Sequence, residues 1–240
     1  MTDMTPPERA FYAKVIDAFG TWLAKVRDAV MAAWHRFRAR PDPDAVYTTI
    51  PLWTTLVDKL EAQLREIGIQ EGGKLVDVPD GSFLDKQLTG SRNFFAGIPD
   101  EVHALIVQEI ADAVAAGKNP QAVADAVDNL LDVHGSDRWI NRARVIATTE
   151  VHRMANAGAQ SAATTLQSLS SEPLFKRWDS RDDDRVRPDH MAADGQMVPV
   201  GSTFTVGDFP MLYPGDPLAP AEQVVNCRCS MSFHKQGAAV

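Results

Sequence analysis

Residues 137–169 read DRWINRARVIATTEVHRMANAGAQSAATTLQSL, and an abrupt change in the character of the sequence follows them. This segment predicts one long helix, which begins after the break at residues 134–136, His-Gly-Ser. After Pro173 the helical periodicity ends, and prolines, glycines and aspartates become frequent. The sequence therefore predicts an α+β fold whose N-terminal two thirds are predominantly helical and whose C-terminal part is a small β-rich module, residues 173–234.

Apolar residues spaced by three or four positions predict further helices upstream of this segment. One runs from Glu8 to about Arg40, and a second runs from Pro51 to a stop near Gly68. Glycines and prolines between residues 70 and 98, with few periodic apolar positions, predict a loop-rich connector. We therefore expect residues 1–99 to form a helical arm and connector.

The second expected domain spans residues 100–240 and begins with helices over residues 100–169. Its first helix covers residues 100–116, and Asn119 followed by Pro120 is typical of an N-cap that opens the next one. In the β-rich module, short apolar runs predict strands at residues 175–178, 197–200, 203–206 and 229–233. Turns are expected at residues 194–195 and 200–202.

Bulk properties exclude several classes of protein. The 240 residues carry a net charge of -8, which argues against a protein that coats nucleic acid by neutralising phosphates. No stretch has the roughly 18–20 apolar residues that span a bilayer, and the N-terminal residues lack the pattern of a secretory signal. We therefore expect synthesis in a cytoplasm, where Cys227 and Cys229 are free thiols or metal ligands.

Two segments concentrate polar residues. On the helix at 137–169, Arg142, Thr149, Arg153 and Asn156 project from one side, which either faces solvent or contacts the module that follows. The second segment, residues 178–229, begins with Trp-Asp and ends with Asn-Cys-Arg-Cys. Between them lie an acidic run at residues 182–184, which predicts a solvated turn, and the stretch Arg-Val-Arg-Pro-Asp-His at residues 185–190.

In their order along the chain, these pieces resemble the phage Mu F-like minor head proteins, a family of head-morphogenesis domains. The resemblance covers roughly residues 100–234 and includes Ile146, Ala147, Thr149, Glu150, Asn156, Trp178, Asp179, Arg185, Arg187, His190, Asp194, Gly195, Pro214 and residues 226–229. One departure is Thr148, because the family often has Arg before the Thr-Glu pair.

The resemblance implies a structural minor head or capsid protein of a tailed bacteriophage, and not an enzyme. Such proteins take part in procapsid assembly and in DNA packaging or delivery near the portal. The implied partners are the portal protein and the major capsid protein, with scaffold or packaged DNA as further candidates. The implied location is the capsid interior of the virion. A toxin-delivery role is disfavoured because few residues follow His234.

His190, Cys227 and Cys229 are ligand types that zinc prefers, with His234 or Asp189 as a candidate fourth ligand. A structural zinc would stabilise a small module with little core of its own. The same residues leave open a metal-dependent nuclease or hydrolase as the alternative function.

A hydrogen-bonded structural network is the interpretation that we favour for these residues. In it His190 bonds Glu150 or Asp179, and Arg185 or Arg187 pairs with Asp179 or Asp184. The residues assigned to the network are Thr149, Glu150, Asn156, Trp178, Asp179, Arg185, Asp194 and Asn226.

Overall fold

A computed structural model describes residues 4–37, 40–76 and 81–235 of the chain. Tertiary contacts divide the chain into two compact units, each built from several segments. Unit 1 comprises Met1–Arg9, Glu61–Ser91 and Val145–Val240, and unit 2 comprises Ala10–Leu60 and Arg92–Arg144. The expected division at residues 99 and 100 is a separate prediction, which these units do not test.

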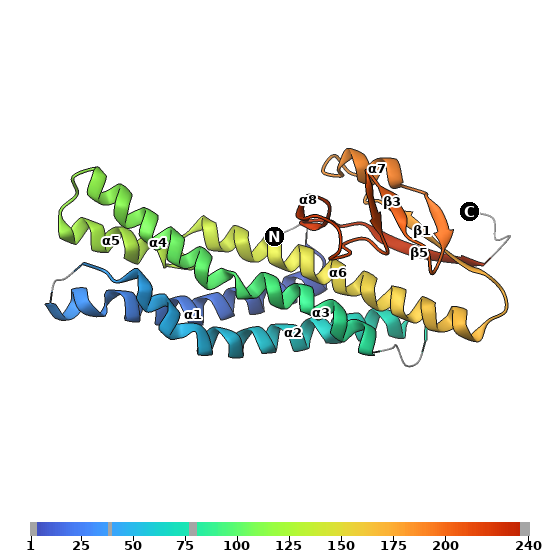
Figure 1. Ribbon diagram of the computed structural model, residues 1–240, viewed down its shortest axis with the longest axis horizontal. Coiled ribbons are helices and arrows are strands. Elements are labelled where there is room, and N and C mark those ends of the chain that lie inside the picture. The colour runs from blue at the N-terminus through green and yellow to red at the C-terminus, as the bar shows by residue number, and fades with distance from the viewer. Residues whose placement is uncertain (1–3, 38–39, 77–80, 236–240) are drawn as a thin grey trace. The chain divides into compact units, whose positions relative to one another are not determined.

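Helices dominate the first 169 residues, so the expected α+β class is confirmed (Figure 1). In chain order they are α1 (Pro6–Phe37), the 3-10 helix η1 (Pro43–Thr49), α2 (Ile50–Gly73), α3 (Gly81–Ala96), α4 (Ile98–Ala115), α5 (Pro120–Leu130) and α6 (Asp137–Leu169). The predicted start of α5 is confirmed, because the Asn119 side chain accepts a hydrogen bond from the backbone N–H of Ala122.

Unit 2 has an apolar core that is rich in aromatic rings. Trp22 of α1 and Trp53 of α2 lie with ring centroids 4.8 Å apart, and Phe19 stacks on Trp53 at 5.6 Å. Each indole N–H finds an acceptor, Thr49 Oγ1 for Trp22 and the Phe95 carbonyl for Trp53. Aromatic rings on the apolar face of a helix bury a large apolar surface, and this burial stabilises the packing of the helices.

The prediction that α2 stops near Gly68 is wrong, since the helix continues to Gly73. In unit 1, Gly68 of α2 faces Gly158 of α6 so closely that a Cβ on Gly158 would lie 1.9 Å from the Gly68 carbonyl oxygen. Gly68 therefore permits two helices to approach, a role that depends on a partner distant in sequence.

The prediction of a loop-rich connector at residues 70–98 is also wrong in large part, because α3 occupies Gly81–Ala96. The glycine at position 90 predicts a loop, but it lies within α3 against Arg153 and Pro217, where a Cβ would meet Arg153 Nη1 at 2.6 Å. Leu84 of the same helix is fully buried, as a core position should be. Residues 77–80 of the connector lie outside the described residues.

The C-terminal part of unit 1 is the predicted β-rich module. Its strands are β1 (Leu174–Asp179), β2 (Met197–Pro199), β3 (Phe204–Val206), β4 (Phe209–Met211) and β5 (Ser230–Lys235), with the short helices α7 (Pro188–Ala193) and α8 (Ala221–Val224). Strand β1 is central in the antiparallel order β2-β1-β5, and β3 pairs with β4. All four predicted strands are present, whereas β4, α7 and α8 were not predicted.

This module has a small core of its own. Trp178 of β1 lies at its centre and meets the Phe204 ring edge-on, with centroids 5.3 Å apart. The same buried cluster includes Val206, Met211 and both cysteines. Two thiols among so few apolar groups show how little hydrocarbon this module has to bury.

None of the helices in the described ranges is long and apolar enough to cross a membrane, as expected from the sequence.

Candidate functional site

The module brings His190, Cys227 and Cys229 together in its interior. His190 comes from α7, and the two cysteines come from the segment between α8 and β5. All three side chains are buried, and their potential ligand atoms lie within 4.8 Å of one another. His190 Nδ1 lies 3.6 Å from Cys227 Sγ and 3.5 Å from Cys229 Sγ. Three soft or borderline ligands thus converge on one point.

A chain of hydrogen bonds orients the imidazole of His190. Gln223 of α8 donates from Nε2 to the Asp189 carboxylate at 2.8 Å, so its Oε1 faces His190 Nε2 at 3.0 Å. Because a carboxylate only accepts, this arrangement assigns the proton of neutral His190 to Nε2. The Nδ1 lone pair then points to the two sulfurs. The Trp178 ring packs on the imidazole edge-on, with the two ring centroids 5.4 Å apart.

The backbone that carries the cysteines is attached to α6. Asn226 has a φ of 58°, in the left-handed region that Asn tolerates better than most residues. Its N–H donates to Thr149 Oγ1 at 2.9 Å, and Asn156 Nδ2 donates to the carbonyls of Cys229 and Pro214. Thr149 and Asn156 of α6 therefore both hold the backbone of the segment that carries the cysteines.

The polar stripe on α6 contacts the module, so the interpretation of this face as solvated is wrong for its unit 1 residues. Arg153 and Asn156 are both buried. Arg153 is paired with Glu150, and Ser91 of α3 bonds both of them. Glu150 is therefore engaged here and not with His190, which corrects one expected pair.

Arginines surround the His-Cys-Cys cluster. Arg228 binds the Asp183 carboxylate through two hydrogen bonds of 2.6 and 2.7 Å, and Arg187 donates to the Val225 carbonyl. The expected pairing of Arg185 or Arg187 with Asp179 or Asp184 is wrong. Asp179 pairs with Arg177, and Arg185 lies 3.8 Å from Asp183. These contacts also replace the expected Asp179–His190 bond.

The two thiols differ in acidity. The hydrogen bond from Cys229 lowers the pKa of Cys227, against the effect of burial, and the nearby Arg187 and Arg228 act in the same direction. The pKa of Cys229 is raised, first by its bond to Cys227 and then by burial. The pair thus favours one thiolate, at Cys227, before the other ionises.

His234 does not join the cluster, so the prediction of His234 as a fourth ligand is wrong. It lies on β5 opposite Phe175, five residues after Cys229 along an extended chain of about 3.3 Å per residue. Its Nε2 bonds Ser232 Oγ at 2.9 Å. Asp189 is also no direct ligand, because Gln223 lies between its carboxylate and the imidazole. Asp194 accepts a hydrogen bond from the Ser180 N–H and thereby fixes the turn at residues 194–195.

Lys176 is a buried polar residue that the sequence reasoning missed. Its ammonium donates to Gln160 Oε1 at 2.9 Å and to the Leu212 carbonyl at 2.6 Å. Burial lowers its pKa to about 8, against the opposing effect of Asp216. Its position two residues before Trp178 puts both side chains on one face of β1, and this spacing was the signal available in the sequence.

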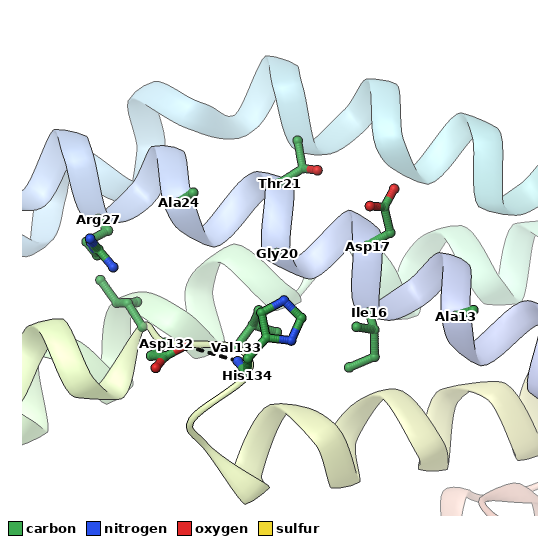
Figure 2. Close-up of a pocket in the computed structure, with 11 residues that line it drawn as sticks. Ala13, Ile16, Asp17, Gly20, Thr21, Ala24, Arg27, Asp132, Val133 and His134 are labelled. Atoms are coloured by element: carbon green, nitrogen blue, oxygen red, sulfur yellow. Dashed lines mark hydrogen bonds between the residues drawn. The ribbon is translucent and has the colours of Figure 1, made fainter. Parts of the chain in front are cut away.

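A pocket also lies within unit 2 (Figure 2). Its volume is about 610 Å³, and α1 contributes Ile16, Asp17 and Gly20 to its wall. His134 lies opposite them, on the segment between α5 and α6, where its backbone N–H bonds the Asp132 carboxylate (Figure 2). Two hydrogen bonds from the backbone N–H groups of Gly135 and His134 lower the pKa of Asp132.

The chain thus combines long helices with a small β-rich module, and several motif residues make hydrogen bonds within unit 1. The family model described as Phage Mu protein F like protein matches residues 104–232, more than half of the chain. The chain therefore belongs to the phage Mu F-like family of head-morphogenesis proteins, as the resemblance implied. The searches of curated proteins and of solved structures gave no match.

Proposed function

We propose that this chain is a minor structural component of a tailed-phage head, incorporated into the procapsid at the portal and retained inside the capsid. There it contacts the portal protein and the major capsid protein, and it acts in assembly and in DNA packaging or delivery without turnover. Membership of the phage Mu F-like family supports a place in the phage head.

A structural role is supported by the hydrogen bonds that the motif residues make within the protein. Thr149, Asn156 and Asn226 hold the cysteine-bearing segment on α6, and Glu150 is occupied by Arg153 and Ser91. Groups that serve as general acids, bases or nucleophiles need an approach to substrate. Glu150, the carboxylate of the motif on α6, is instead held by Arg153 and Ser91.

Co-assembly with the portal tests the location. The full chain, carrying a tag, is co-expressed with the portal and major capsid proteins of its own phage, with and without the portal gene. We expect the chain in sedimented shells only when the portal is present, and we expect it to copurify with isolated portal rings. Equal incorporation into shells without portal would refute the portal contact.

Protease protection tests the capsid interior. Intact particles should protect the chain, and particles opened by mild heating should expose it to cleavage. Cleavage of the chain in intact particles, with an internal control protein still protected, would contradict the interior location.

A further inference from the structure

We propose that His190, Cys227 and Cys229 bind one Zn²⁺ ion through Nδ1 and the two Sγ atoms, with a fourth ligand supplied by solvent. The site is independent of where the protein sits in the head, so it goes beyond the proposed function. Its ligands are a thiolate pair and an imidazole, the set that zinc favours over oxygen-seeking cations.

Distances support the proposal. A tetrahedral zinc with Zn–S bonds of about 2.3 Å and Zn–N bonds of about 2.0–2.1 Å holds its nitrogen and sulfur ligands about 3.5 Å apart. The structure has Nδ1 3.6 Å from Cys227 Sγ and 3.5 Å from Cys229 Sγ. Both nitrogen–sulfur distances therefore match those around a single ion, and all the ligand atoms lie within 4.8 Å of one another.

In a metal-free arrangement, one thiol bonds Nδ1 and the two thiols bond each other. The Nδ1 lone pair can accept a strong bond from one thiol, yet both sulfurs are directed at it inside the module. A zinc ion would bind all three groups at once. It would also add a cross-link between α7 and the segment before β5, in a module whose apolar core is small.

The surroundings of the imidazole match those of a metal ligand. Zinc-bound histidines usually donate their other N–H to a carboxylate, carbonyl or similar acceptor, which fixes the tautomer. His190 does so through Gln223, which is itself held by Asp189. We assign Gln223 as a positioning residue, whose loss should weaken zinc binding without removing a ligand.

A small pocket has all three ligand residues in its wall, and a solvent ligand in the fourth position would occupy it. Its wall also carries Arg181, Arg185, Arg187 and Arg228. Cations beside the site stabilise thiolates and favour water, hydroxide or another small anion as the remaining ligand.

Zinc content is measured on the full chain, expressed with zinc supplied and purified without chelator. We expect one zinc per chain in the wild type and in H234A, the matched control whose histidine lies outside the cluster. We expect much less in H190A and C229A, and a 10- to 100-fold weaker affinity in Q223A. Zinc absent from the wild type, or retained equally by H190A, would overturn the proposal.

Because those variants can fail to fold, X-ray absorption on the wild type gives a second test. The expected zinc environment has two sulfur and two lighter scatterers. A shell of nitrogen and oxygen alone would refute the site. So would two freely reactive thiols in the folded, zinc-supplied protein, or a disulfide between Cys227 and Cys229.

Discussion

The interior of unit 2 is almost wholly apolar, whereas the C-terminal module of unit 1 buries several polar side chains. Among the described residues, Thr49 is the one buried polar residue of unit 2, and even it accepts from an indole. The module alone buries Lys176, His190, Asp216 and Gln223. Long helices carry enough large apolar side chains to form a core by themselves. A module of three- to six-residue strands does not, and it relies on specific polar bonds.

The largest effect is expected in unit 2. Trp22→Ala removes a fully buried ring that packs on Trp53, and it should lower the free energy of unfolding by about 3–5 kcal/mol. Urea denaturation followed by circular dichroism measures this loss. V114A, at a half-exposed position of α4, is the control and should change stability by less than about 0.5 kcal/mol. Similar losses in the two variants would mean that the aromatic core is not what stabilises unit 2.

The second effect is expected where helices of unit 1 approach most closely. Gly158→Ala places a methyl group against the Gly68 carbonyl and should cost about 3 kcal/mol or more, because backbone must move. G73A is the matched control, since a Cβ there meets no atom within 4 Å. Thermal denaturation of both proteins gives the comparison. A Gly158→Ala protein as stable as G73A would show that the close approach is not required.

A smaller effect is expected from the buried Lys176 of the module, which should make stability depend on pH. The folded-state pKa of Lys176 is about 8, below its ordinary value of 10.5, so the unfolded chain binds the extra proton between these values. Stability should therefore rise by on the order of 2 kcal/mol as pH increases from 8 to 10.5. Urea denaturation at several pH values measures the rise.

Lys176→Met separates this contribution from those of other titrating groups, and its curve should lack the rise. K118A, altered in the exposed segment before α5, should keep it. Parallel curves for wild type and Lys176→Met over this range would contradict the lowered pKa of the buried Lys176.

Much of the fold could be predicted from the sequence because its signals are local. The N-cap at Asn119, the bounds of α6 and the four strands follow from periodicity and from residues that begin or end elements. The glycines at positions 68 and 90 were misread for the opposite reason. Each lies within a helix and leaves room for a partner remote in sequence, Gly158 or Arg153. No local pattern in the sequence reveals that partner.

Some residues of the candidate site could likewise be predicted from the sequence, and others could not. Residue type alone selected His190, Cys227 and Cys229, and the structure brings them together. Selecting His234 as well was wrong, because β5 carries it away along an extended strand. Gln223 could not be selected, since a glutamine is an ordinary surface residue until α8 places it between Asp189 and His190.

The sequence by itself determined the class of fold, the family and the three cluster residues, because these depend on the identity and order of residues along the chain. The tertiary structure decided which polar groups meet. It paired Glu150 with Arg153, buried Lys176 beneath Gln160, and gave His190 the tautomer that directs Nδ1 at two sulfurs. Partners in a buried network are set by packing, since a buried donor or acceptor takes the group that folding brings within reach.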